Sequence, residues 1–215
     1  MPTWIKICGT TSFEDALASV AAGADALGFI FAPSPRRISA QQARGIATQL
    51  PGKIERVGVF VNEPAEAIRS TVEQVGLTAV QLHGGETPEF IADLFARGTH
   101  LPRVKVIKTI LANESFDATL ALFRRHHECL DSILLDSGAG SGKTFDWHKI
   151  QDQVGADSLR FILAGGLNPE NVGEAMQKFS PWGVDVVSGV ERAPGRKDPD
   201  KLKAFVAAVR KAEQQ

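Results

Sequence analysis

The sequence contains no tyrosine and only two cysteines, Cys8 and Cys129. Two cysteines are too few for the disulfide framework of a small secreted protein, and neither belongs to a Cys-x-x-Cys metal pair. Because tyrosine is absent, no phenol is available to share a proton transfer. We therefore expect two free thiols, and acid or base chemistry that rests on groups other than phenols.

The sequence also lacks an excess of charge and a long apolar run. Lys and Arg number 24 against 25 Asp and Glu, so the net charge is -1 and there is no electrostatic footprint for nucleic acid or an anionic membrane. No apolar run reaches the roughly 18–20 residues of a membrane helix, and the first residues do not resemble a signal peptide. We expect a cytoplasmic protein with neither a nucleic-acid nor a membrane partner.

What the sequence does contain is a regular alternation of short apolar runs and amphipathic stretches. Hydrophobic residues make up 43% of the 215 residues, and no linker or low-complexity segment divides them, so residues 1–215 are expected to form one domain. The strand-like runs are 4–9, 26–31, 56–61, 79–84, 103–110, 132–137, 160–166 and 183–189. The helix-like stretches are 12–24, 39–50, 64–76, 87–98, 114–128, 146–155, 168–179 and 199–213.

Residues that begin and end helices support these boundaries. Ser39, Thr87 and Asn168 are expected N-caps, and a proline in the first turn is expected at positions 64, 88 and 169. Glycines at 23, 76 and 98 are expected to end helices.

Strands that are each followed by a helix, without hairpins, predict a parallel sheet. Units of about 27 residues are close to the minimum for a strand and its crossover helix. Eight such units predict an α/β fold of the closed (β/α)8 type, a TIM barrel, with a doubly wound open sheet as the alternative. In such a barrel the active site lies at the carboxyl ends of the strands.

Cys8 ends the first predicted strand. Strand alternation puts Lys6 on the same face, roughly 7 Å away along the strand, and an ammonium there favours the thiolate and makes the sulfur a base or nucleophile. The alternative is a small buried hydrophobic side chain, which is the interpretation we adopt for Cys129. A lysine inside a barrel requires a charge partner, and Asp185 on the last predicted strand is the candidate.

Asp136 ends the sixth predicted strand, directly after Ile133, Leu134 and Leu135. Apolar surroundings raise the pKa of a carboxyl, which suits a general acid or base, whereas the alternative is a cap on the following loop. A thiol and a carboxyl group facing each other across a barrel mouth would suit an isomerisation that moves two protons.

Two features predict binding of anionic groups. Arg36 and Arg37 lie in a proline-flanked loop after the second strand, and Arg36 is the candidate to bind a carboxylate or phosphate. Glycine-rich turns follow strands seven and eight, and their freed backbone N–H groups would form a phosphate cradle unless the glycines only make tight turns. These turns contain Gly165, Gly166, Ser188 and Gly189. A phosphorylated substrate is the main hypothesis.

Three further features lie near the predicted mouth. His83 is a base, a ligand or a hydrogen-bonded structural residue, and because it has no partner at ligand spacing we predict no metal site. Lys108 falls near the end of strand five, with no assigned role. The glycine-rich segment 137–144 lacks the first glycine of a nucleotide-binding P-loop and is interpreted as a mobile loop over the active site.

Taken in order, several motifs resemble those of the phosphoribosylanthranilate isomerase family. They are Lys6–Gly9, Gly58–Asn62, Val80–Gly84, Leu134–Asp136, Gly140–Gly142 with Phe145–Trp147, Ala164–Val172 and Asp185–Glu191. They run from the first strand to the last, so the resemblance covers essentially the whole chain. One departure is Ala164, where similar sequences commonly have serine near the phosphate.

The resemblance implies a cofactor-independent Amadori rearrangement in tryptophan biosynthesis, from N-(5-phosphoribosyl)anthranilate to 1-(2-carboxyphenylamino)-1-deoxyribulose 5-phosphate. It implies Asp136 as the general acid, Cys8 as the general base, and Arg36 as the group that binds the anthranilate carboxylate. It also implies that Gly166 and the Ser188–Gly189 segment cradle the phosphate. His83, Gly165 and Asp185 are further candidate substrate contacts. A phosphorylated small molecule is the expected partner, and the protein is expected to be a monomer or a homodimer.

Two alternatives share this barrel. A related phosphoribosyl isomerase of histidine biosynthesis typically pairs two aspartates, whereas this chain has Cys8 at the first of those positions. A barrel that only binds a phosphorylated ligand would need neither Cys8 nor Asp136.

Overall fold

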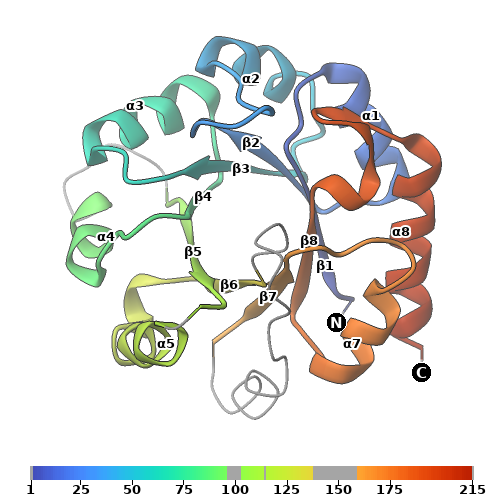
Figure 1. Ribbon diagram of the computed structural model, residues 1–215. Coiled ribbons are helices and arrows are strands. Elements are labelled where there is room, and N and C mark those ends of the chain that lie inside the picture. Colours follow the sequence, from blue (N-terminus) through green and yellow to red (C-terminus); the bar gives the residue numbers. More distant parts are fainter. Residues whose placement is uncertain (1, 96–102, 114, 138–158, 215) are drawn as a thin grey trace.

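The computed structural model describes residues 2–95, 103–113, 115–137 and 159–214. Eight parallel strands form a closed barrel in chain order, and helices surround it (Figure 1). The strands are β1 (Trp4–Cys8), β2 (Ala26–Ile30), β3 (Glu55–Phe60), β4 (Ala79–Leu82), β5 (Lys105–Leu111), β6 (Ser132–Asp136), β7 (Phe161–Ala164) and β8 (Gly183–Val186). The helices are α1 (Phe13–Ala22), α2 (Ala40–Ala47), α3 (Ala65–Val75), α4 (Pro88–Leu94), α5 (Phe116–Arg125), α7 (Val172–Phe179) and α8 (Pro199–Ala212).

The pairing of β1 closes the barrel. Lys6 of β1 is in register with Ala26 of β2 on one side and with Asp185 of β8 on the other. The (β/α)8 prediction is therefore confirmed, and the open-sheet alternative is wrong. The predicted helix at 146–155, residues 138–144 of the predicted loop and Gly98 lie outside the described residues.

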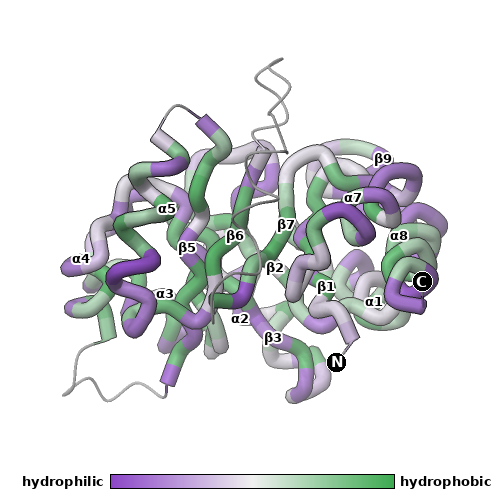
Figure 2. Tube along the Cα trace, turned by 90° about the horizontal axis from the view of Figure 1, so that it is seen from below, coloured by the Kyte–Doolittle hydropathy of each residue, from purple (hydrophilic) through white to green (hydrophobic). Residues whose placement is uncertain are grey.

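Two apolar cores hold the fold together. A small core fills the barrel interior with Trp4, Ala26, Val57, Ala79, Ile107, Leu134, Ile162 and Ala164. The larger core lies between the barrel and the helices, and Figure 2 shows the strands as hydrophobic segments inside more polar helical turns. Every second strand residue points inward, so the polar residues that end the inward rows are delivered to the barrel mouth.

Most helix boundaries follow the expected capping residues. The side chains of Ser39 and Thr87 cap α2 and α4, and Gly23 and Gly76 end α1 and α3 in the left-handed conformation. The prediction for Asn168 is wrong. Its side chain instead accepts hydrogen bonds from the backbone of Glu170 and Asn171 in a turn that precedes α7, and Asn171 is the N-cap.

Two prolines also differ from expectation. Pro64 is itself the N-cap of α3, and Pro169 lies before α7, whereas Pro88 occupies the first turn of α4 as expected. None of the helices in the described part of the chain is long and apolar enough to cross a membrane.

The chain after β8 adds an element that the strand and helix pattern did not predict. A 3-10 turn, Ser188–Val190, leads into a two-stranded antiparallel hairpin of β9 (Glu191–Ala193) and β10 (Arg196–Lys197). The ammonium of Lys197 donates to the backbone oxygens of Cys8 at 2.6 Å and Val187 at 3.2 Å. The hairpin thus ties the carboxyl ends of β1 and β8 together.

Candidate active site

A charged layer crosses the barrel interior just below its mouth. The Lys6 ammonium lies 2.9 Å from a carboxylate oxygen of Asp185 and donates to Oε1 of Gln81 at 2.8 Å. Burial alone would lower the pKa of Lys6, but the charges of Asp185 and Cys8 raise it above its usual value, so Lys6 stays protonated. The predicted Lys6–Asp185 pairing is confirmed.

Cys8 lies one inward position above Lys6, at the carboxyl end of β1, and is only 3% exposed. Burial raises the pKa of its thiol above the usual value, although the neighbouring charge of Lys6 acts in the opposite direction. Its cross-strand neighbour is Gly28, where an added Cβ would lie only 2.4 Å from the sulfur. Glycine at this position therefore makes the room that the sulfur occupies.

Asp136 ends β6 at the same rim, with 23% of its side chain exposed. Its Oδ2 lies 3.9 Å from Nε2 of His83, which follows β4. Burial lowers the pKa of His83, Asp136 opposes this shift and Lys6 adds to it, so the imidazole is neutral at pH 7. An added Cβ at Gly165 would lie 2.6 Å from Oδ1 of Asp136, so glycine is needed for this close approach of β7.

Gln81, which the sequence did not mark as a site residue, connects Lys6 to His83. Besides accepting from Lys6, its amide nitrogen lies 3.3 Å from Nδ1 of His83 and 3.2 Å from the Thr109 hydroxyl. Its place in the Val80–Gly84 motif, on the inward row that ends at His83, was the available signal.

Arg36 makes an ion pair that the sequence analysis also did not predict. Its Nε and Nη2 donate to the carboxylate of Glu191 at 2.8 Å and 2.6 Å, and these hydrogen bonds raise the pKa of Arg36. Burial alone would raise the pKa of Glu191, but Arg36 and Lys197 lower it, so both partners are charged. Gly9, in the left-handed conformation with φ of 74°, gives the Arg36 chain room to cross the end of β1, since an added Cβ would lie 2.7 Å from Arg36 Cδ.

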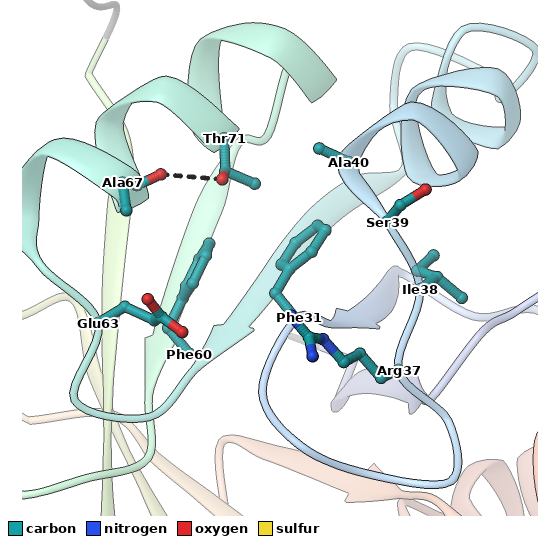
Figure 3. A pocket seen from close by; sticks show the side chains of 9 residues that line it. All are labelled: Phe31, Arg37, Ile38, Ser39, Ala40, Phe60, Glu63, Ala67 and Thr71. Carbon is teal, nitrogen blue, oxygen red and sulfur yellow. Dashed lines mark hydrogen bonds between the residues drawn. The ribbon is translucent and has the colours of Figure 1, made fainter.

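Arg37 belongs to a different place. It lines a pocket of about 490 Å³ between α2 and α3, outside the barrel, together with Glu63 and the stacked rings of Phe31 and Phe60 (Figure 3). The two arginines of the loop therefore diverge, and only Arg36 reaches the hairpin that closes the end of β8.

The turns after β7 and β8 pack directly on each other. Gly165 and Gly166 both have positive φ, at 89° and 68°, and an added Cβ at Gly189 would lie 2.0 Å from the backbone oxygen of Leu167. The backbone amides of Gly166 and Ser188 donate to no other described residue. These two turns thus bring N–H groups together at one edge of the mouth.

Lys108 does not face the mouth. It lies in the middle of β5 with its side chain on the outer face, where its ammonium is 2.8 Å from Glu86 and 2.6 Å from the Gly84 backbone oxygen. Its inclusion among residues at strand ends is therefore wrong: β5 continues to Leu111, and the inward neighbour is Thr109. Among the described residues, no group of three or more His, Cys, Asp or Glu side chains is arranged to hold a metal ion.

Comparisons with known proteins agree with this architecture. A family model described as N-(5'-phosphoribosyl)anthranilate (PRA) isomerase matches residues 5–208. The N-(5'-phosphoribosyl)anthranilate isomerase of Thermotoga maritima is 45% identical over 204 residues, which cover 94% of this chain and 96% of that protein.

Two solved structures have the same fold at similar identity. A crystal structure of phosphoribosyl anthranilate isomerase in complex with reduced 1-(o-carboxyphenylamino)-1-deoxyribulose 5-phosphate has a TM-score of 0.81 and 42% identity, and covers 97% of this chain and 99% of that chain. A crystal structure of monomers generated from the dimeric Thermotoga maritima enzyme has a TM-score of 0.80 and 41% identity, over 97% of this chain and 98% of that chain. With the family model matching nearly every element of the barrel, the chain belongs to the N-(5'-phosphoribosyl)anthranilate isomerase family.

Proposed function

We propose that this protein catalyses the Amadori rearrangement of N-(5'-phosphoribosyl)anthranilate to 1-(2-carboxyphenylamino)-1-deoxyribulose 5-phosphate, with Asp136 as general acid and Cys8 as general base. Family membership makes the chain an aldose–ketose isomerase of tryptophan biosynthesis. The observation that carries the residue assignment is the placement of a thiol beside a buried ammonium and of a carboxyl beside a neutral imidazole, both at the carboxyl ends of barrel strands.

Asp136 acts first in this scheme. Its carboxyl proton passes to the ribose ring oxygen, the bond from that oxygen to C1 breaks, and the nitrogen lone pair forms the C=N bond of a Schiff base. Asp136 is left as a carboxylate that has 23% of its side chain exposed, so it can be reprotonated from solvent between turnovers.

Cys8 then acts as the base. Its thiolate takes the proton from C2, the C2–H electron pair forms the C1–C2 double bond, and the C=N electrons return to nitrogen to give an enolamine that tautomerises to the ketone. Burial raises the pKa of the thiol, which makes its thiolate a stronger base, while the fixed charge of Lys6 keeps that thiolate accessible.

Arg36 is the proposed binding residue for the anthranilate carboxylate. Glu191 engages Nε and Nη2 of its guanidinium, and the Nη1 amino group is on the other branch of the fork. A cation held in place by a buried carboxylate loses little side-chain entropy on binding, so the pair orients the guanidinium in advance.

The proposed phosphate site is the edge formed by the turns after β7 and β8. The N–H groups of Gly166 and Ser188 are the proposed donors, with Gly165 and Gly189 allowing the close backbone approach. A family member holds a reduced sugar phosphate of this type, which supports a phosphorylated ligand here. We further propose that the protein works in the cytoplasm without a cofactor, as a monomer or a homodimer.

The test uses phosphoribosylanthranilate generated in the cuvette, with the loss of anthranilate fluorescence as the signal. The purified protein is expected to accelerate that loss, and Cys8→Ser and Asp136→Asn are each expected to lower kcat by about 10²–10⁴-fold. Cys129→Ser, which removes the other thiol, is the control and should keep the rate. Absence of acceleration would refute the reaction, whereas a near-full rate in either active-site variant would refute that residue's role.

A further inference from the structure

Gln81 links Lys6, which precedes Cys8 on the inward face of β1, to His83, which lies beside Asp136. It is 2% exposed on β4, inside the barrel, and its side chain has three polar partners: Lys6 on its oxygen, and His83 and Thr109 on its nitrogen. A buried amide with its partners arranged in this way has one hydrogen-bonding orientation rather than two.

The direction of each hydrogen bond follows from chemistry. The Lys6 ammonium can only donate, so Gln81 must turn its oxygen toward Lys6 and its NH2 group toward His83. Nδ1 of His83 must then accept. A neutral imidazole carries one proton, and with Nδ1 as the acceptor that proton is on Nε2.

Nε2 is the atom that faces Asp136, at 3.9 Å from Oδ2. This distance is longer than a direct hydrogen bond, so the Nε2–H group acts on Oδ2 through its partial positive charge, which favours the carbonyl form of that oxygen and the carboxyl proton on Oδ1. Protonation of His83 on Nδ1 would instead place two N–H donors against each other. The charges that act on His83 are those of Asp136 on β6, Lys6 on β1 and Asp185 on β8 inside the barrel, and that of Lys108 on the outer face of β5.

We propose that Gln81 is a positioning residue that holds His83 in the Nε2–H tautomer and thereby orients the carboxyl group of Asp136. The series of polar contacts runs in one direction, from the Lys6 ammonium through the Gln81 amide and the His83 ring to Asp136. The charge of Lys6 therefore also affects the orientation of the Asp136 carboxyl group. The catalytic consequence rests on the proposed role of Asp136, whereas the tautomer does not.

The first test reads the tautomer in the unmodified protein. In the full-length protein labelled with 15N-histidine, the His83 ring resonances, assigned by comparison with His83→Gln, are expected to show Nε2 protonated and Nδ1 unprotonated at neutral pH. This pattern should persist when the pH is lowered below the ordinary histidine pKa of about 6.5, because burial lowers the pKa of His83. A protonated Nδ1 at neutral pH, in either the other tautomer or the imidazolium, would overturn the proposal.

The second test reverses the direction of the hydrogen bond between residue 81 and His83. Gln81→Glu presents only acceptors, so it can still accept from Lys6, but it requires a proton on Nδ1 of His83. We expect that proton to appear in the 15N spectrum and kcat to fall by about tenfold to hundredfold with little change in KM. Gln74→Glu makes the same change on the exposed face of α3 and is the matched control, with spectrum and rate unchanged.

Gln81→Met serves if the buried carboxylate prevents folding. It removes the donor without adding charge, so His83 is expected to show a mixture of tautomers and kcat to fall. An unchanged His83 spectrum in a folded Gln81 variant would refute the positioning role. Absence of acceleration by the unmodified protein would refute the proposed reaction, and full rates in Cys8→Ser or Asp136→Asn would refute the proposed catalytic roles. Neither result changes the tautomer of His83, so the failure of the proposed function and the failure of this inference are distinguishable.

Discussion

Replacing Gly28 with alanine should impair the proposed base, Cys8, without changing the cysteine itself. Gly28 is the cross-strand neighbour of Cys8, and a Cβ at this position would lie 2.4 Å from the Cys8 sulfur and 3.0 Å from its Cα. Van der Waals contact requires about 3.5 Å, so the sulfur must move by about 1 Å or the two strands must separate. The backbone contact to Cα means that a side-chain rotation alone does not relieve the overlap.

Both responses have measurable consequences. Overpacking of this kind costs about 1–3 kcal/mol of folding free energy, and each kcal/mol lowers the Tm of a domain of this size by about 2–4 °C. A displacement of about 1 Å of a reacting atom costs about 100-fold in rate. We therefore expect Gly28→Ala to remain folded at 25 °C with kcat reduced by about two orders of magnitude.

The assay is the loss of anthranilate fluorescence, with urea unfolding run on the same samples. Gly45→Ala is the matched control, since no atom lies within 4 Å of a Cβ added there and the position is in α2, where alanine stabilises a helix by about 0.5–1 kcal/mol over glycine. A folded Gly28→Ala protein with kcat close to that of the wild type would refute the assignment of Cys8 as a base that requires this position.

Two further predictions concern titration. In a Cys129→Ser background, the ultraviolet absorbance of the Cys8 thiolate should rise with a midpoint above the ordinary thiol pKa of about 8.5, because burial raises the pKa, and the absence of tyrosine keeps the signal clean; a midpoint at or below that value would contradict the structure. Burial alone would raise the pKa of Glu86, but the hydrogen bond and the charge of Lys108 lower it below its usual value. When the pH falls toward about 4.3, the ordinary pKa of a glutamate in an unfolded chain, the folded state therefore binds fewer protons than the unfolded state. Stability should therefore drop below that pH as Glu86 is titrated, and Glu86→Gln should be less stable at pH 7 and lose less on acidification in urea unfolding; equal acid sensitivity in both proteins would exclude this pair as the cause.

The Lys6–Asp185 pair illustrates what strand alternation can predict. Lys6 and Cys8 share the inward face because the period of a strand is two, and a lysine inside a barrel needs a charge partner. Both statements depend on local pattern and on the cost of burying a charge, and the structure bears out the pairing at 2.9 Å.

Lys108 and Asn168 illustrate where that reasoning fails. The alternation of residues along β5 does not by itself show which of two neighbours faces the barrel interior. In the folded protein Thr109 faces the interior, and Lys108 faces outward and pairs with Glu86. Asn168 has the chemistry of an N-cap, but the turn after β7 uses its side chain to accept from two backbone amides before the helix begins.

The sequence by itself determined the eight strands, the approximate positions of the helices in the described part of the chain, and the barrel, because hydrophobic period and capping chemistry are local properties. Apart from the Lys6–Asp185 pair, the partners of the site residues were decided by the tertiary structure. Glu191 binds Arg36, Gln81 joins Lys6 to His83, and Lys197 holds the ends of β1 and β8 together. The Arg36–Glu191 and Lys6–Gln81 contacts each join residues more than fifty positions apart in the sequence. Lys197 belongs to a hairpin that the strand and helix pattern did not predict. Such contacts depend on how the closed barrel brings distant strand ends to one rim, and that geometry exists only once the chain is folded.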